Sequence, residues 1–92
     1  MRLHWLSKAR SDLYRLHEFV TPINEDAALK ILDSLVQAVS GLQENPRLGR
    51  RVANQGQDEV RSLVVRAYEI RYAIRGEDIY VLRIWHTRES RQ

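Results

Sequence analysis

The chain has 92 residues, of which 43% are hydrophobic and 29% charged, and its net charge is +3. These values predict one globular domain over residues 1–92 and exclude a disordered chain. The absence of cysteine excludes a disulfide framework, a thiolate metal site and a cysteine nucleophile. We expect a cytoplasmic location without membrane contact, because no apolar run approaches the roughly 18 residues of a membrane span and the start lacks a signal peptide's apolar stretch.

The first half of the sequence predicts a short strand and two helices. Residues 1–5 alternate in polarity and predict the strand. Ser7 is a candidate N-cap for a helix that ends at Val20 before Thr21-Pro22, with polar residues such as Asp12 off its apolar stripe. Asn24 is the candidate cap of a second helix that ends near Glu44, with a wider apolar stripe.

The second half predicts a loop over residues 46–58 and then three strands, over residues 60–65, 68–75 and 79–86. In the middle strand Tyr68, Ile70, Tyr72 and Ile74 share one face. The last strand is apolar on both faces, which predicts a central position. The order βααβββ indicates an α+β domain, in which a helical hairpin packs on an antiparallel-rich four-stranded sheet.

Cofactor motifs are missing from the sequence. The histidines His4, His17 and His86 lie far apart without ligand spacing, and the four glycines form no phosphate-binding loop. The sequence therefore predicts no metal and no cofactor.

Charge is distributed unevenly along the chain. Residues 1–44 hold five basic and six acidic residues, whereas residues 45–92 hold ten and six. An anionic partner is therefore expected to meet the second half, although a solvated basic surface explains the same excess.

Basic residues gather on the predicted strands and at the end of the last one: Arg61, Arg71, Arg83, His86 and Arg88. A histidine that moves a proton, together with guanidinium groups that stabilise a phosphate, is the minimum set for RNA cleavage. Two other interpretations stay open. Arg71 and Arg83 can pair with acids such as Glu69, or the basic surface can receive an acidic or amphipathic peptide.

Four segments resemble motifs of the RelE/ParE toxin superfamily, in the same order and spacing: ARSDL at 9–13, NPRLGR at 45–50, VRSLVV with YEIRY at 60–72, and IYVLRIWHTR at 79–88. The resemblance covers nearly the whole chain, and the βααβββ order is also that superfamily's. It implies the toxin of a bacterial type II toxin–antitoxin pair. One branch of the superfamily inhibits DNA gyrase and blocks replication, and the other cleaves mRNA on the ribosome.

Three features favour the gyrase branch, which has no catalytic residues of its own. Glu69 follows Tyr68 where the RNase branch carries arginine, the strand at 60–65 has no lysine, and no tyrosine follows Tyr80. The RelE-like mRNA endoribonuclease remains the alternative, with His86, Arg83 and Arg61 as its catalytic residues. Whether the protein is an enzyme therefore stays open, and a domain that only binds antitoxin is a third possibility.

The resemblance also implies two partners. We expect basic residues to meet gyrase or, alternatively, the ribosome and mRNA: Arg47, Arg50, Arg51, Arg83, His86 and Arg88. A cognate antitoxin, whose C-terminal segment folds on binding, is expected to dock on the middle strand and its neighbour: Tyr68, Arg71, Tyr72, Arg75 and Arg83.

Overall fold

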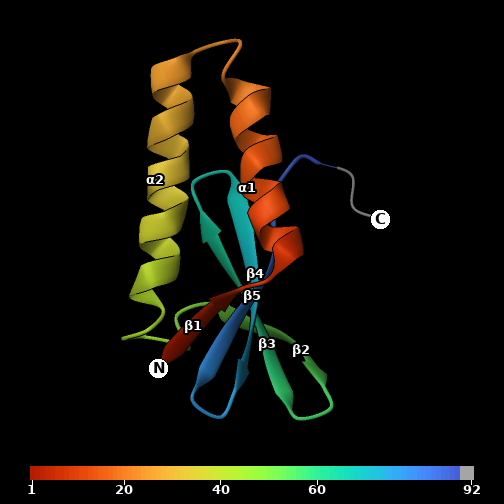
Figure 1. Ribbon diagram of the computed structural model, residues 1–92. Coiled ribbons are helices and arrows are strands. Elements are labelled where there is room, and N and C mark those ends of the chain that lie inside the picture. The colour runs from red at the N-terminus through yellow and green to blue at the C-terminus, as the bar shows by residue number, and fades with distance from the viewer. Residues whose placement is uncertain (90–92) are drawn as a thin grey trace.

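The computed structural model describes residues 1–89, in which a helical hairpin packs on one face of a sheet (Figure 1). The elements in chain order are β1 (Arg2–Trp5), α1 (Ser7–Val20), α2 (Glu25–Gly41), β2 (Arg50–Gln55), β3 (Asp58–Val65), β4 (Tyr68–Arg75) and β5 (Asp78–His86). The sheet has five strands in the order β1-β5-β4-β3-β2. β1 runs parallel to β5, and the other neighbouring pairs are antiparallel. The α+β class and the antiparallel-rich sheet are confirmed, whereas the predicted number of four strands is wrong.

The additional strand is β2, which lies inside the segment predicted as a loop. It pairs with β3 after a turn at Gly56, whose φ of 60° lies in the left-handed region that glycine adopts without strain. β2 lies at the edge of the sheet, and most of its side chains are exposed. An edge strand that buries little needs no apolar alternation, so its sequence lacks the usual strand pattern.

The helix ends agree with the sequence at two of four positions, because α2 ends at Gly41, before the predicted Glu44. The Asn24 side chain accepts a hydrogen bond from the Ala27 N–H at 3.0 Å, which confirms it as the cap of α2. The prediction of Ser7 as a cap is wrong, because Leu6 is the capping position and makes no side-chain bond. The Leu6 N–H still bonds the Val81 carbonyl at 3.1 Å, so β1 leads directly into the helix. No helix within residues 1–89 is long and apolar enough to cross a membrane.

The core lies between the hairpin and one face of the sheet. Tyr68, Ile70, Tyr72 and Ile74 share the core face of β4, as predicted, although Glu69 and Ala73 on the other face are buried as well. Tyr68 and Ile70 pack with residues of both helices, and Tyr72 and Ile74 form a second cluster at the end of α2. The predicted central position of β5 is wrong, because β5 lies between β4 and the short β1, and β1 pairs with it only as far as Val81. Within residues 1–89, no helix covers the opposite face of the sheet.

Candidate interaction surface

A row of three arginines crosses the face of the sheet opposite the hairpin. Arg50 of β2 lies opposite Ser62 of β3, Ser62 lies opposite Arg71 of β4, and Arg71 lies opposite Arg83 of β5. Directly opposed residues point to the same face, and neighbouring strands are about 4.8 Å apart. Arg50, Arg71 and Arg83, here called the arginine row, therefore lie on the face opposite the hairpin, although the guanidinium group of Arg83 also reaches Asp12 of α1.

The indole of Trp85 supports two members of the arginine row. The guanidinium carbons of Arg71 and Arg83 lie 5.2 and 5.0 Å from the centroid of the Trp85 ring, within the range of cation–π contacts. Covered in this way, Trp85 is only 9% exposed on a face without helices. The indole thereby offsets part of the repulsion between two like charges that face each other across strands.

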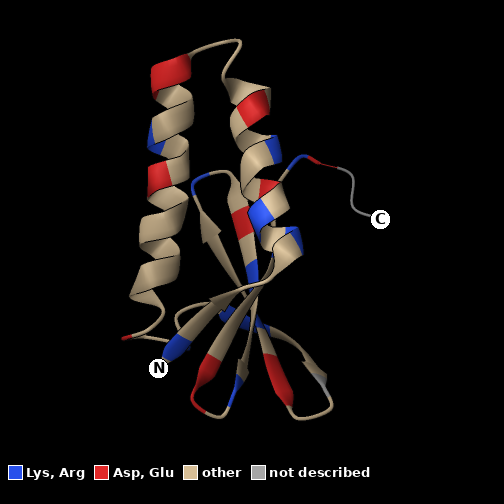
Figure 2. Ribbon diagram, in the orientation of Figure 1, with Lys and Arg blue, Asp and Glu red and all other residues tan. Residues whose placement is uncertain are grey.

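Two members of the arginine row also pair with acids of the same chain. Arg71 donates to Glu69 at 2.9 Å, and Arg83 donates to Asp12 at 2.8 Å. Both arginines thus pair with acids, but neither pair joins two strands: the Glu69 contact lies within β4, and the Asp12 contact reaches α1. Arg50 is exposed and makes no ion pair within residues 1–89. The charge of the arginine row is therefore shielded at Arg71 and Arg83 and unshielded at Arg50. Figure 2 shows that acidic and basic residues alternate along the strands more generally.

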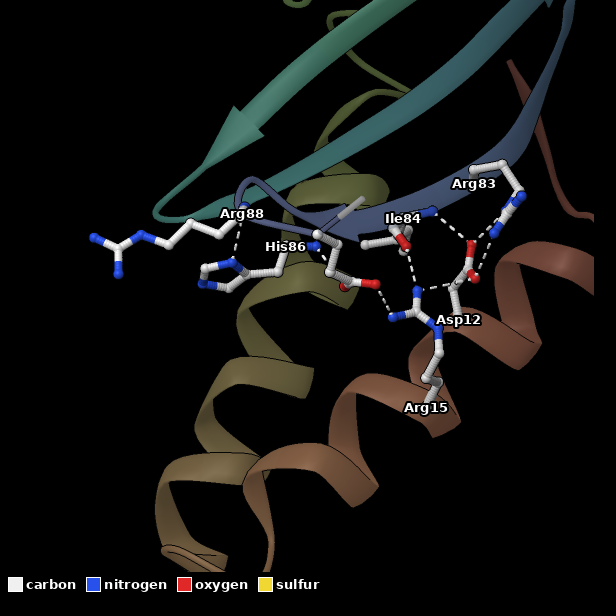
Figure 3. Close-up of polar contacts among 7 residues, drawn as sticks. Asp12, Arg15, Arg83, Ile84, His86 and Arg88 are labelled. Atoms are coloured by element: carbon white, nitrogen blue, oxygen red, sulfur yellow. Dashed lines mark hydrogen bonds and ion pairs between the residues drawn. The ribbon is translucent and has the colours of Figure 1, made fainter. Parts of the chain in front are cut away.

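Asp12 is the buried centre of the contacts between α1 and β5 (Figure 3). Its side chain is 5% exposed and accepts the backbone N–H of Ile84 at 2.8 Å. It also accepts two hydrogen bonds from Arg83, at 2.8 and 3.1 Å, and one from Arg15 at 3.1 Å. Four donors surround one carboxylate, which is the arrangement that a buried charge requires.

The same helix side chains close an edge of the sheet. β1 ends at Trp5, so the outer edge of β5 beyond Val81 has no strand neighbour within residues 1–89. There Arg15 donates to the Ile84 carbonyl at 3.1 Å and to Glu89, and Glu89 accepts the backbone N–H of His86 at 2.9 Å. Side chains thus replace the hydrogen bonds of a missing strand.

Both carboxylates of this network are more acidic than usual. Burial alone would raise the pKa of Asp12, but the hydrogen bonds from Arg83, Ile84 and Arg15 outweigh burial and lower that pKa. The pKa of Glu89 is lowered by the same balance, in which burial is opposed by Arg15 and the His86 N–H. Both groups are therefore ionised near neutral pH.

The free energy of unfolding is expected to decline as the pH falls below about 4. A carboxylate with a lowered pKa in the folded state contributes stability above its ordinary pKa, and this contribution disappears as the pH falls through the lowered value. Urea unfolding of the wild type between about pH 5 and pH 3 measures the slope. Asp12→Asn should flatten it, whereas Asp33→Asn, at an exposed position of α2, should keep the wild-type slope. Equal slopes for all three proteins would contradict the assignment.

His86 lies at the end of β5 beside a pocket of about 840 Å³. Its Nδ1 accepts the backbone N–H of Arg88 at 3.1 Å, so the neutral ring carries its proton on Nε2. The ring packs edge-on against Tyr68 at 5.2 Å between centroids. The 76% exposed Phe19 of α1 lines the same pocket. No group of three or more metal-ligating side chains occurs within residues 1–89.

The loop between α2 and β2 is held by Tyr72 and Arg61. The Tyr72 hydroxyl donates to the Pro46 carbonyl at 2.7 Å and accepts the Gly49 N–H at 2.9 Å. Burial raises the pKa of Tyr72, so the hydroxyl keeps the proton that it donates. Arg61 donates to the Gly49 carbonyl at 2.6 Å. The loop is thus anchored to β3 and β4.

Arginines outnumber acids around this loop. Glu59 of β3 contacts Arg47 at 3.2 Å, Arg51 at 3.5 Å and Arg61. Arg50 adds a further positive charge without an ion pair in the described chain. We call Arg47, Arg50 and Arg51 the basic edge, because they lie on or next to the outermost strand.

The residues of the catalytic alternative contact different groups of their own chain within residues 1–89. Arg61 bonds loop carbonyls, Arg83 bonds Asp12, and His86 faces the pocket beside Arg88. Two guanidinium groups of the set are therefore occupied by groups of their own chain. The six predicted target-binding residues likewise lie at three places. Three form the basic edge, Arg83 lies beside Asp12, and His86 and Arg88 lie at the pocket.

The predicted antitoxin-binding residues require a correction. Tyr72 is 0% exposed and lies in the core, so it offers no free surface, whereas Tyr68 is buried but lines the pocket beside His86. β4 is the central strand with neighbours on both sides, so its backbone cannot accept a further strand. Arg71 lies in the arginine row, and Arg75 pairs with Asp58 at 2.6 Å. Arg71, Arg75 and Arg83 are the members that remain reachable.

Sequence reasoning missed Asp12, Trp85 and the place of Arg50 in the row. The prediction that Asp12 lies off the apolar stripe is wrong, because it falls between the buried Ala9 and Leu16 at helical spacing. That spacing is the signal that could have identified it. Gly56, ahead of a strong strand, was the signal for a hairpin and hence for β2.

Comparison with known proteins agrees with this architecture. The family described as "ParE toxin of type II toxin-antitoxin system, parDE" matches residues 3–91. Toxin RelE1 of Caulobacter vibrioides is 32% identical over 84 residues, which cover 91% of this chain and 90% of that protein. A solved structure described as the chromosomal ParDE TA system from P. aeruginosa matches with a TM-score of 0.77 and 28% identity, over 91% of this chain and 92% of that one. The chain therefore belongs to the ParE toxin family of type II toxin–antitoxin systems.

Proposed function

We propose that this toxin acts by binding DNA gyrase, which blocks replication, and that a cognate antitoxin neutralises it. One observation carries the choice of target: Arg61 and Arg83, which RNA cleavage would require, are engaged by carbonyls and an acid of their own chain. With Arg61 and Arg83 so engaged, the surface of residues 1–89 is better suited to binding a macromolecule than to cutting a phosphodiester. Membership of the ParE family supports the same choice, as do Glu69 after Tyr68 and the lack of lysine at 60–65.

The basic edge and the arginine row supply the electrostatic part of target binding. Arg50 belongs to both and carries unshielded charge, which steers the protein toward the anionic gyrase–DNA complex. His86 and Arg88, with the exposed Phe19 nearby, supply a second contact with apolar character. The contribution of the arginines to association should weaken as salt is added.

The antitoxin is the second partner. The similar P. aeruginosa structure is described as a ParDE system, which supports a partner of the ParD kind for this chain. Carboxylates of an antitoxin segment placed against Arg71, Arg75 or Arg83 would add to the acids that already pair with these arginines and would neutralise the charge left for the target. The antitoxin would therefore inhibit the toxin by covering residues that bind the target.

The second candidate function is ribosome-dependent mRNA cleavage. His86 favours it, because its imidazole ring lies beside Arg88 at the pocket at the end of β5. The name of the similar Toxin RelE1 points to the same branch.

Purified protein is expected to abolish supercoiling by gyrase and to accumulate cleaved DNA. His86→Ala should retain this activity within about threefold, because a binding surface loses only one contact. Supercoiling gels and a ribosome-dependent mRNA cleavage assay, run on both proteins, measure the two activities.

Cleavage of ribosome-bound mRNA with gyrase unaffected would overturn the gyrase proposal, particularly if His86→Ala folds normally and loses the cleavage. Expression without antitoxin adds a control in cells. If cells grow normally although the protein accumulates, the chain has no toxic activity, and only the antitoxin-binding role is left.

A further inference from the structure

The helical hairpin carries an apolar groove that none of the functions above uses. α1 and α2 lie side by side (Figure 1), and the groove between them has a volume of about 290 Å³. Its lining comes from the two helices alone: Arg10, Leu13, Tyr14, His17, Leu32 and Val36. Tyr14 is 73% exposed and Val36 39%, and Leu29, one turn before Leu32, is 53% exposed. Apolar side chains gathered on one exposed face indicate a docking surface for another protein.

Opposite charges flank the centre of this groove at equal distances. Arg10 lies four residues before Tyr14 and Glu18 four residues after it, so the three side chains share one side of α1. Each charge is about 6 Å along the helix axis from Tyr14, because a helix rises about 1.5 Å per residue. Arg10 and Glu18 are exposed and form no ion pair within residues 1–89, whereas Arg15 of the same helix pairs with two acids. The groove therefore has a basic end and an acidic end, and neither charge is neutralised within the described chain.

This charge pattern is complementary to itself in one orientation. Two hairpins can face each other across a two-fold axis that runs perpendicular to α1, and their helices are then antiparallel. With the axis beside Tyr14, Arg10 of each copy lies opposite Glu18 of the other, which forms two equivalent ion pairs. A parallel arrangement would place Arg10 against Arg10, which like-charge repulsion disfavours. The page of charges on α1 thus selects a second copy of this chain in the antiparallel orientation.

We propose that the groove face of the hairpin is the interface of a homodimer, in which two copies pack antiparallel around Tyr14. Leu29 of one copy then meets Val36 of the other, because these residues lie three positions before and four positions after Leu32 on α2. Burial of the apolar side chains supplies the affinity, and the two ion pairs fix the orientation. The proposal is independent of the toxin's target, because the interface contains no residue of the arginine row or the basic edge.

Sedimentation equilibrium of the full chain without antitoxin should show a mass that rises from one chain toward two as the concentration increases. Tyr14→Glu, which places like charges at the two-fold axis, and Arg10→Glu should each raise the dissociation constant by at least about tenfold. The double variant Arg10→Glu/Glu18→Arg restores opposite charges across the interface and should return to within about threefold of wild type. Arg66→Glu makes the same charge change in the β3–β4 turn, at an exposed position, and should stay within about twofold. Circular dichroism and thermal unfolding verify that the variants fold.

A cross-link tests the symmetry directly, because the chain has no cysteine of its own. A disulfide needs Cα atoms within about 4.4–6.8 Å of each other, a separation that equivalent residues reach at the axis of two closely packed helices. Tyr14→Cys should therefore form a covalent dimer when copper phenanthroline and air oxidise the thiols. Arg66→Cys, at an exposed position outside the interface, should stay monomeric under the same conditions.

Three results would overturn the proposal. A monomer at every concentration tested would show that the groove serves another partner, and protection of α1 amides from exchange in the antitoxin complex would identify that partner as the antitoxin. A dimer that neither Tyr14→Glu nor Arg10→Glu weakens would place the interface on another surface. If Arg10→Glu weakens the dimer and the double variant with Glu18→Arg does not restore it, although both proteins fold, the antiparallel arrangement is wrong.

Discussion

Replacing Asp12 with alanine is expected to lower the free energy of unfolding by about 3–5 kcal/mol. The carboxylate is buried and accepts hydrogen bonds from Arg83, Arg15 and the Ile84 backbone. Its removal leaves the Ile84 N–H without a partner and Arg83 beside a cavity, so the desolvation cost remains without compensation. Urea denaturation at neutral pH measures the loss, and Asp33→Ala, at an exposed position of α2, is the matched control.

Asp12→Asn tests whether the free energy of unfolding depends on the charge of the carboxylate or only on its shape. The amide keeps one acceptor oxygen but replaces the other with a donor that faces donors, so its destabilisation should fall between wild type and alanine. A loss below about 1 kcal/mol for Asp12→Ala would show that water replaces the carboxylate and that the network contributes little to the free energy of unfolding.

Part of the fold could be predicted from the sequence, and the network around Asp12 shows what could not. Both helices and β3 to β5 bury one face or two, so their apolar residues repeat with the period of the element. β2 buries little at the edge and therefore leaves no periodic trace. Asp12 breaks the expected pattern, because its partners Arg83 and Ile84 lie about seventy positions away and no local rule connects them.

The candidate interaction surface could likewise be predicted from the sequence only in part. The sequence correctly placed basic residues on the last strands, and it raised the pairing of Arg71 with Glu69 as one interpretation. The arginine row depends on β2 and on the registers of three strand pairs, which cannot be obtained without the missing strand. The burial of Tyr72 could be read from its alternation with Ile70, yet its bond to the loop required tertiary structure.

Gly49→Ala is the second large effect, with an expected loss of about 3 kcal/mol in the free energy of unfolding. A Cβ at this position would lie 2.7 Å from the Ser62 carbonyl oxygen and 2.9 Å from the Tyr72 hydroxyl. The Ser62 carbonyl is part of the β3 backbone and cannot rotate away, so the loop must move and lose its anchor. Gly41→Ala is the control, because nothing lies within 4 Å of its Cβ position, and it should change stability by less than about 1 kcal/mol.

A double-mutant cycle with Tyr72→Phe tests the cause of this loss. Tyr72→Phe alone should cost about 1–2 kcal/mol, because it removes the partner of the Gly49 N–H and of the Pro46 carbonyl. The double variant should lose less than the sum of the single losses, since both changes break the same hydrogen bond and phenylalanine relieves one of the two close contacts. The Ser62 carbonyl still opposes the new methyl group, so Gly49→Ala should stay destabilising in the Tyr72→Phe background. Additive losses would mean that the loop and β4 are independent, and the anchoring of Arg47 next to β2 would then need another explanation.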